Sequence, residues 1–315
     1  MTQDLALRPD AMTVERCVAG AGALDAASEV GVLELLSTHR CTIEEVASTL
    51  DLDRRFIRFL LDALSSVGAV RLVNGRYEAV ISSERLDGTR RLWAALPDAL
   101  RSGNGPIDVS RGEDGTTYAP VIGHLARLTE PLLGEVVGAL DGLGPRVLDV
   151  GAGAASWTRT LAAADPTLHV TVLDHGDVLE QTRGFVESDR LGERFSYRAG
   201  DVSETDLGGP YDLVLVAGLC RLYGGAWVVR MLERLVGAMA PGATLAVLDA
   251  LPDEDRADGD SNALYALGLA LRTSTGGIHS FSSYAAWLHG VGLVDIQLTL
   301  LDRPELSLIR AIRPV

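Results

Sequence analysis

Residues 146–157 read Arg-Val-Leu-Asp-Val-Gly-Ala-Gly-Ala-Ala-Ser-Trp, and this stretch decides the fold of the chain. Val147, Leu148 and Val150 form a short apolar run that ends at Gly151 and Gly153. Apolar residues at helical spacing then follow from Trp157 onwards. The pattern predicts a strand, a tight glycine turn and a helix. Such a turn lets backbone N–H groups and a helix N-terminus come close to a ligand.

The ligand that suits this turn combines adenosine with a positive charge. A dinucleotide-binding turn requires a third glycine or alanine where this chain has Ser156. Asp149, just before the glycines, would repel a pyrophosphate but attract an ammonium group. Asp174 ends the next apolar run, at about the spacing where a carboxylate binds the hydroxyls of a ribose. S-adenosylmethionine, an adenosine joined to a cationic amino acid, carries both groups.

The stretch resembles the nucleotide-binding motif of class I S-adenosylmethionine-dependent methyltransferases. Nearly the whole chain is similar to the small-molecule O-methyltransferase family of plant and bacterial natural-product pathways, which has an N-terminal dimerisation domain. The resemblance implies methyl transfer to a small molecule. The competing interpretation is a glycine turn that only packs a strand against a helix. Asp149, Asp174 and the pair Gly200-Asp201, all in register with the family motif, weigh against it.

The composition is that of a folded, acidic protein. With 47% hydrophobic residues and 315 residues in all, the chain is long enough for two domains and a large core. It contains no lysine, which excludes Schiff-base chemistry and a Walker-type phosphate loop. The net charge of −15 argues against nucleic acid as a partner, because that affinity depends mainly on cations.

Cysteine usage and hydropathy point to a cytoplasmic protein without metal or membrane. Cys17, Cys41 and Cys220 are odd in number and show no C-x-x-C pairing, so neither a disulfide framework nor a zinc site is expected. Residues 1–9 lack the pattern of a secretory signal. The longest near-apolar stretch, 235–248, is broken by Pro241 and Gly242 and is too short to span a bilayer.

Residues 1–100 are predicted to form a winged-helix domain. Helical spacing runs from 11 to 36, Thr42 to Glu45 has the pattern of a capping box, and a further helix is expected over 53–67. Two strands at 68–73 and 76–80 flank Asn74-Gly75, which is typical of a tight hairpin.

A winged helix has two functional interpretations. Three arginines (Arg54, Arg55 and Arg58) cluster on the helix that would read DNA. Residues 1–100 nevertheless hold 11 arginines and 15 acidic residues, a net charge of −4, and no basic wing. In the family that the chain resembles, this domain forms a homodimer, and we favour that role over a ligand-sensing regulator.

Residues 101–120 are rich in glycine and polar residues and are interpreted as a linker, followed by a catalytic domain at 121–315. From 118 to 140 the pattern is helical. Strand-like runs at 195–199, 212–217 and 244–250 then alternate with helical runs at 177–188 and 226–239, and a last strand pair spans 294–300 and 307–313. Alternation of this kind predicts an α/β fold, a Rossmann-like and mostly parallel sheet. The last pair resembles the antiparallel hairpin that closes the methyltransferase sheet.

In such a sheet the ligand lies beyond the carboxyl ends of the strands, so the residues after each strand are the candidates. The family's Gly-Asp pair after the third strand binds the adenine, which implies that role for Gly200-Asp201. The predicted cofactor-binding residues are Asp149, Gly151, Gly153, Asp174, His175, Asp201, Val202, Ala217 and Gly218.

The segment after the fourth strand departs from the family. Related O-methyltransferases usually carry a histidine there, within a Leu-His-Asp-Trp-like motif, and it takes the proton from the acceptor hydroxyl. Arg221 stands at or beside that position and, being always protonated, cannot be a base. A salt bridge is its plainest alternative role.

Three explanations stay open. The acceptor can be acidic or already nucleophilic, so that positioning alone suffices. Another side chain can be the base, with His279 and His124 as candidates. The cofactor can instead serve non-methylating chemistry such as decarboxylation, hydroxylation or cyclisation, in which Arg221 would hold a carboxylate or polarise a carbonyl. Leucines at 264, 267, 269 and 271 suggest a hydrophobic, aromatic acceptor.

Overall fold

The chain folds as two compact units, Met1–Pro97 and Asp98–Val315, called here the first and second unit. The structure is a computed structural model that describes all residues except 1–10, 110–117, 120–121, 141, 253–261 and 302–305. The boundary between the units falls three residues before the predicted end of the N-terminal domain. Residues 108 and 109, within the predicted linker, belong to the second unit and bond within it: Val109 N–H donates to the Arg272 carbonyl at 2.8 Å, and Asp108 accepts from Ser274 N–H at 3.3 Å.

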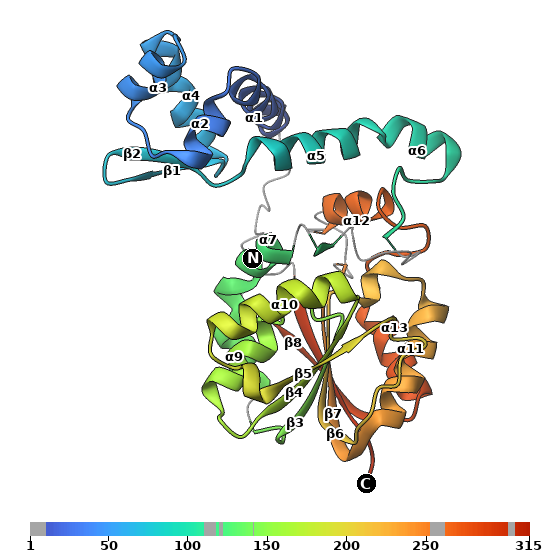
Figure 1. Cartoon of the computed structure of the whole chain (residues 1–315). Helices are drawn as coiled ribbons and strands as arrows, with labels where there is room; N and C mark the ends of the chain where they lie inside the picture. The colour runs from blue at the N-terminus through green and yellow to red at the C-terminus, as the bar shows by residue number, and fades with distance from the viewer. Residues whose placement is uncertain (1–10, 110–117, 120–121, 141, 253–261, 302–305) are drawn as a thin grey trace, which may run out of the picture. The chain divides into compact units, whose positions relative to one another are not determined.

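The first unit has the helix and hairpin order of a winged helix (Figure 1). Its elements are α1 (Ala11–Glu29), α2 (Val32–Thr38), α3 (Ile43–Thr49), α4 (Arg54–Ser66), β1 (Val70–Val73), β2 (Arg76–Ala79) and α5 (Ser83–Ala94), and α6 (Leu96–Ser102) crosses the boundary.

Local sequence signals set the ends of these elements. The predicted capping box is present, because Thr42 Oγ1 accepts from Glu45 N–H at 3.2 Å while the Glu45 carboxylate accepts from Thr42 N–H at 2.8 Å. The Asp53 side chain caps α4 by accepting from Phe56 N–H at 2.9 Å. Behind these caps, Leu33, Leu61 and other apolar side chains form a buried core.

The second unit is built on one seven-stranded sheet, and the predicted fold class is confirmed (Figure 1). Its strand order is β5-β4-β3-β6-β7-β9-β8, with β3 to β7 parallel and β8 and β9 antiparallel. The strands are β3 (Arg146–Val150), β4 (His169–Asp174), β5 (Phe195–Ala199), β6 (Tyr211–Ala217), β7 (Met239–Asp249), β8 (Val294–Leu300) and β9 (Ser307–Ile312).

Helices cover both faces of the sheet, since side chains alternate between the faces along each strand. On β3, Val147 packs with the layer of α8, α9 and α10, whereas Leu148 and Val150 pack with that of α11 and α13 (Figure 1). The helices are α7 (Ile122–Thr129), α8 (Leu133–Leu140), α9 (Ser156–Ala164), α10 (Gly176–Ser188), α11 (Gly225–Ala238), α12 (Ala263–Ala270) and α13 (Phe281–Gly290).

The helical stretch expected over 118–140 is interrupted. A short 3₁₀ turn, η4 (Glu130–Leu132), separates α7 from α8 and contains Pro131, which has no N–H to continue a helix. The strand expected to begin at Thr244 begins at Met239 instead, where the helical prediction ended. Among the described residues, no helix combines the length and the apolar content needed to cross a bilayer.

Candidate functional site

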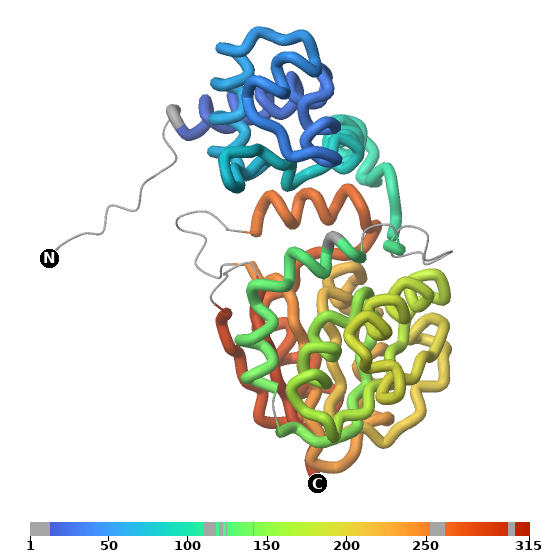
Figure 2. The backbone as a smooth tube through the Cα atoms, turned by 60° about the vertical axis from the view of Figure 1, so that its left-hand side comes forward, coloured from blue at the N-terminus to red at the C-terminus, as the bar shows by residue number. Residues whose placement is uncertain are grey.

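The candidate site lies at the edge of the sheet where the parallel strands end. β3, β4, β6 and β7 reach this edge side by side, and α7 and α12 lie over it in both views (Figures 1 and 2). The loops that follow these strands carry most of the predicted site residues, because all parallel strands present their carboxyl ends together. The fold therefore brings together residues that are up to about 100 positions apart in the sequence.

The loop between β3 and α9 is held tightly against the neighbouring strand. Gly151 N–H donates to the Leu173 carbonyl at 2.9 Å. Gly151 has φ +63°, and a Cβ there would lie 3.2 Å from two methyl carbons of Leu219. A side chain at this position would be strained and crowded, so glycine keeps the backbone open on the ligand side.

Asp174 fastens this loop from the end of β4. Its Oδ2 accepts from Gly153 N–H at 2.9 Å, and its Oδ1 accepts from His175 N–H at 2.8 Å. Burial raises the pKa of Asp174, whereas the two amide donors lower it. A carboxylate oxygen can accept more than one hydrogen bond, so Asp174 retains acceptor capacity for the hydroxyls of a ribose.

Asp149 is the most unusual carboxylate of the site. Its side chain is buried; Oδ2 accepts from Thr158 Oγ1 at 2.5 Å, and Oδ1 has no hydrogen-bond partner in the described part of the chain. Burial, reinforced by the charge of Asp174, raises the pKa of Asp149 to about 7. An unsatisfied buried carboxylate oxygen is costly unless a ligand pairs with it. A cation such as an ammonium group fits this oxygen.

Other predicted cofactor residues lie at the same edge of the sheet, after the carboxyl ends of β5 and β6. Asp201 Oδ1 accepts from Ser203 N–H at 2.6 Å, which shapes the turn after β5, and Val202 beside it is buried. After β6, Gly218 N–H donates to the Leu248 carbonyl at 2.8 Å. Together with Asp149 and Asp174, these positions suit the amino acid, ribose and adenine parts of S-adenosylmethionine.

Arg221 lies in a 3₁₀ turn, η6 (Cys220–Leu222), and is fixed by Asp249 at the end of β7. Arg221 N–H donates to Asp249 Oδ2 at 3.2 Å, and Arg221 Nε lies 3.4 Å from Asp249 Oδ1. The guanidinium carbon lies 5.1 Å from the centre of the Tyr265 ring. The salt bridge considered from the sequence is thus present, and it involves the Nε edge of the guanidinium.

Asp249 and Tyr284 also belong to this site, and neither was among the predicted site residues. The Tyr284 hydroxyl donates to Asp249 Oδ2 at 2.7 Å, and both side chains are buried. Asp249 is the last residue of β7, as Asp174 is of β4, so the strand-end rule that found Asp174 could have found it. Tyr284 comes from α13, and only the tertiary fold brings it to the site.

The two candidate histidines differ in what the structure describes. His279 Nε2 lies 3.0 Å from the Tyr223 carbonyl and 3.3 Å from the Cys220 carbonyl. Carbonyl oxygens only accept, so Nε2 carries the hydrogen and this side of the ring holds the η6 turn. His124 belongs to α7, but its side chain lies outside the described residues. A role for either as a base stays a prediction.

Cys220 and the site tyrosines have no ionised form near neutral pH. Burial raises the pKa of the Cys220 thiol far above its usual value. Burial likewise raises the pKa of Tyr118 and of Tyr223 to about 12. These side chains therefore give no base or nucleophile. Within the described ranges, His, Cys, Asp and Glu side chains form no group able to hold a metal ion.

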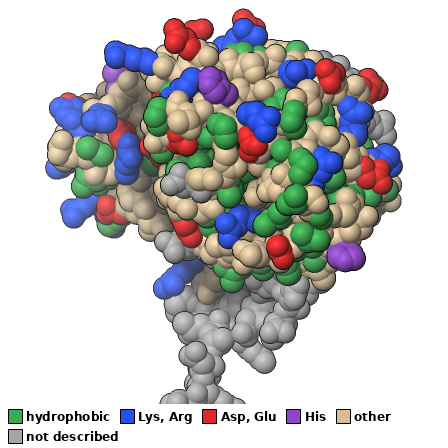
Figure 3. All heavy atoms as spheres, turned by 90° about the horizontal axis from the view of Figure 1, so that it is seen from below, with side chains coloured by type: hydrophobic (Ala, Val, Ile, Leu, Met, Phe, Trp, Pro, Cys, Tyr) green, Lys and Arg blue, Asp and Glu red, His purple; other side chains and the backbone are tan. Residues whose placement is uncertain are grey.

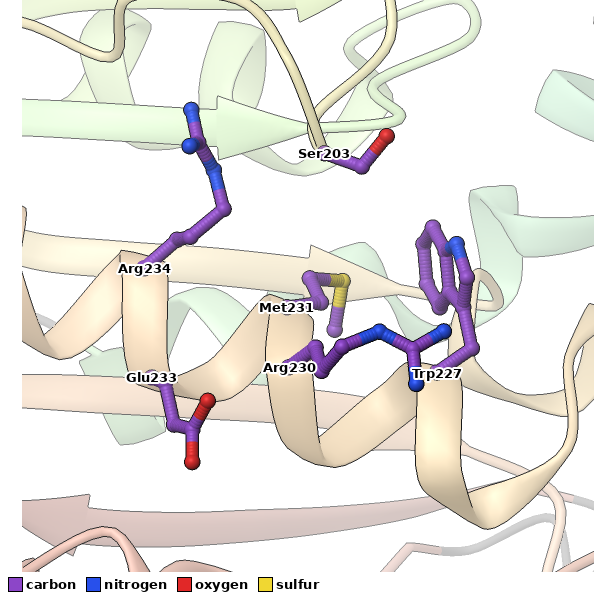
Figure 4. Close-up of a pocket in the computed structure, with 6 residues that line it drawn as sticks. All are labelled: Ser203, Trp227, Arg230, Met231, Glu233 and Arg234. Atoms are coloured by element: carbon purple, nitrogen blue, oxygen red, sulfur yellow. The ribbon is translucent and has the colours of Figure 1, made fainter.

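A cavity of about 250 Å³ is lined by residues of α11 and by Ser203 of the turn after β5 (Figure 4). Arg234 reaches across it and donates to the carbonyls of Val202 and Thr205, at 2.9 and 2.6 Å. Trp227 lines the cavity and stacks on Tyr223, with ring centres 3.6 Å apart. Arg234 thus supports the turn after β5, and none of the predicted site residues lines the cavity.

Comparison with known proteins shows which family the chain is similar to. The model of a family described as O-methyltransferase domain matches residues 130–293. A mitomycin biosynthesis 6-O-methyltransferase of Streptomyces lavendulae is 28% identical over 304 residues, covering 87% of this chain and 85% of the relative. A tetracenomycin polyketide synthesis 8-O-methyltransferase of Streptomyces glaucescens is 23% identical over 310 residues and covers 91% of each.

The fold itself is shared with solved structures. Human N-acetylserotonin methyltransferase in complex with S-adenosylmethionine superposes with a TM-score of 0.75 at 20% identity, and the match covers 100% of both chains. At this level of identity the match shows a common fold, including both units of the chain.

Proposed function

Because the chain belongs to the O-methyltransferase domain family, we propose that it transfers a methyl group to an oxygen of a small aromatic molecule. The protein is an enzyme, a methyltransferase, and its cofactor is S-adenosylmethionine. The observation that carries the proposal is the unpaired, buried Oδ1 of Asp149 beside the glycine turn. That oxygen calls for a cation, and S-adenosylmethionine has an ammonium group attached to an adenosine.

Each part of the cofactor has a proposed partner. Asp149 pairs with the ammonium group, the bare backbone of Gly151 and Gly153 lies against the amino acid part, and Asp174 accepts from the ribose hydroxyls. Asp201 accepts from the adenine amino group, and Val202 packs on the ring. When bound, S-adenosylmethionine supplies an electrophilic methyl group on a sulfonium cation.

The acceptor is proposed to be a flat, largely apolar natural product. Aromatic side chains gather near Arg221, among them Tyr118, Tyr265 and Tyr284. On α12, Leu264 and Leu267 are exposed. Such a set is typical of a pocket for an aromatic ligand. The two Streptomyces relatives are named for steps in mitomycin and polyketide synthesis, which agrees with this class.

The first unit is proposed to form a homodimer. Val14 and Val18 lie one turn apart on α1, and Phe56 and Phe59 lie one turn apart on α4; all four are more than half exposed. Large apolar side chains in such numbers on one small domain mark an interaction surface. Replacing Phe56 and Phe59 together by aspartate is expected to yield monomers in analytical ultracentrifugation. The same change at Leu72, exposed on the hairpin, serves as the control.

Nucleic acid is not a proposed partner. The first unit carries a net negative charge, and the chain as a whole carries −15. Figure 3 shows acidic and basic side chains interspersed over one face of the molecule, without a broad basic patch. A cytoplasmic location is proposed on the sequence pattern described above.

Calorimetric titration with S-adenosylmethionine and S-adenosylhomocysteine tests the cofactor site. The wild type is expected to bind both, and Asp174→Asn is expected to weaken binding about 10-fold or more, because a charged acceptor is lost. Asp177→Asn, the same change three residues later on α10, is the matched control. Mass spectrometry of a panel of hydroxylated aromatics then detects methyl transfer. Absence of binding to either ligand would contradict the proposal.

A further inference from the structure

Arg221 stands at or beside the position where related enzymes carry their histidine base. The Nη1–Nη2 edge of its guanidinium suits a role other than that of a base. We propose that the Arg221 guanidinium binds the reacting oxygen of the acceptor as an anion. The enzyme then selects aromatic acceptors with an ionisable hydroxyl and methylates the ionised form, without a protein base. This inference rests on the proposed O-methyl transfer and names its acceptor class, a phenolate.

The Nε edge of Arg221 is already engaged by the protein. Nε donates to the Gly218 carbonyl at 3.3 Å and lies 3.4 Å from Asp249 Oδ1. Asp249 is itself held by the Tyr284 hydroxyl at 2.7 Å and by Ala250 N–H at 2.9 Å. A carboxylate fixed from several sides cannot swing round to take the second edge of the guanidinium.

The other edge, formed by Nη1 and Nη2, is the one left for a ligand. In the described part of the chain, neither nitrogen donates a hydrogen bond to a protein acceptor, and the side chain is 23% exposed. A guanidinium presents its donors in a flat fork that fits an oxyanion. With Asp249 on the Nε edge only, this fork faces outward from the pair.

Glycine at 218 makes room for this orientation. Gly218 has φ +69°, and a Cβ there would lie 2.5 Å from Arg221 Nη2. On the ring side, Tyr265 lies against the guanidinium, with its centre 5.1 Å from Cζ. The guanidinium is thus confined between a bare backbone and an aromatic face, which orients the fork before any ligand arrives.

The turn that carries Arg221 is clamped from the loop before α13. Gly277 N–H donates to the Arg221 carbonyl at 2.9 Å, and His279 Nε2 bonds to the carbonyls of Tyr223 and Cys220. Gly224 N–H donates to Thr275 Oγ1 at 3.2 Å. Because backbone and side chain are both fixed, little reorganisation is needed to stabilise an oxyanion, the condition under which such donors are most effective.

No titratable group near Arg221 in the described part of the chain is placed to accept the proton of the acceptor hydroxyl, so this proton goes to the solvent. The titratable groups near Arg221 are Asp249, Tyr118, Tyr265 and Tyr284. Tyr118 and Tyr284 stay neutral, since burial raises the pKa of both. Asp249 is enclosed by donors. A positive charge beside a phenol lowers the pKa of that phenol, so the proton passes to water as the acceptor binds.

The methyl transfer then balances without a further proton acceptor. The phenolate oxygen attacks the methyl carbon, an O–C bond forms, and the C–S bond breaks with its electron pair passing to sulfur. The anion and the sulfonium cation become a neutral ether and a neutral thioether. A hydrogen-bonded phenolate is somewhat less nucleophilic than a free one, but a larger fraction of the bound acceptor is ionised.

Absorbance titration of bound phenols tests the inference directly. Three chromogenic phenols (4-nitrophenol, 4-nitro-1-naphthol and 7-hydroxycoumarin) are titrated with pH in the presence of saturating S-adenosylhomocysteine, which blocks turnover. In the wild type we expect the pKa of at least one bound phenol to fall by about one unit or more. Its methyl ether, which cannot ionise, should bind about 10-fold more weakly than the phenol.

Variants separate charge from structure. In Arg221→Gln the pKa of the bound phenol should return to its solution value, whereas Arg221→Lys should retain part of the shift. Arg272→Gln is the matched control, because Arg272 also lies against Tyr265, at 6.0 Å, yet bonds through Nε to Gly268. In Arg272→Gln the ionisation constant of the bound phenol should stay within about twofold of its value in the wild type. If Arg221→Gln fails to fold, the wild type and Arg221→Lys still give the readout.

Each contrary result has its own meaning. An equal phenol pKa in the wild type and in Arg221→Gln would overturn the inference. So would tight binding of S-adenosylhomocysteine with no binding of any phenol, since the acceptor class would then be wrong. Failure to bind S-adenosylhomocysteine at all would contradict the proposed function itself, and the inference with it.

Discussion

Asp149 should make the affinity for the cofactor depend on pH. Without ligand, burial raises the pKa of this carboxyl to about 7, and its Oδ1 is unpaired. A bound ammonium group would stabilise the ionised form and bring the pKa back towards its usual value of 3.8. Below pH 7, the ligand must therefore displace a proton from Asp149 as it binds.

The magnitude follows from the size of that shift. Well below pH 7 the affinity should fall about tenfold for each pH unit, and between pH 7 and pH 5 it should fall about 50-fold, which is about 2.3 kcal/mol. Above pH 7 it should be nearly constant. The free energy of unfolding of the ligand-free protein should instead fall as the pH rises. The pKa of Asp149 is higher in the folded than in the unfolded chain, so its stabilising contribution is complete below pH 4 and is lost as the pH rises through about 7.

Calorimetry with S-adenosylhomocysteine between pH 5 and pH 8 measures both quantities. Titrations in two buffers of different ionisation enthalpy count the protons released, and we expect close to one at pH 5.5 and close to none at pH 8. Asp149→Asn cannot titrate and is the control; a small remaining slope in this variant would come from Asp174, whose pKa is also raised. Equal pH slopes in the wild type and in Asp149→Asn would refute the reasoning.

Three further predictions concern single side chains. Tyr284→Phe leaves the buried Asp249 carboxylate without its hydroxyl donor and should lower the free energy of unfolding by about 1–3 kcal/mol in urea titrations. Tyr211→Phe, which leaves only a backbone carbonyl without its donor, should lower the free energy of unfolding by less. A larger loss in Tyr211→Phe would contradict this prediction. His279→Gln should keep activity within about tenfold with an unchanged pH profile, because glutamine can still donate to the turn, whereas loss of a titrating limb would identify His279 as a base. Thr42→Ala should destabilise the first unit by about 1 kcal/mol in thermal unfolding, with Thr42→Ser close to wild type; no difference between the two would argue against the capping box.

Much of the fold was predictable because its signals are local. The glycine turn after β3, the hairpin at Asn74-Gly75 and the cap at Thr42 each depend on residues a few positions apart, and the structure contains all three. The alternation of strands and helices likewise gave the parallel sheet. The interruption at Pro131 and the early start of β7 were missed, because apolar spacing continues across both boundaries.

In the candidate site too, the features that depend on local sequence were predictable and those that depend on distant residues were not. By itself the sequence determined the positions at the ends of the strands, since a parallel sheet presents all its carboxyl ends at one edge; Asp174, Asp201 and Arg221 came from that rule, and Asp149 from its place just before the glycines. Only the tertiary structure decided that Asp149 has an unpaired oxygen and that Arg221 is held by one edge. Burial and hydrogen-bond partners depend on distant residues such as Tyr284, 35 positions beyond Asp249, and no spacing along the chain encodes them.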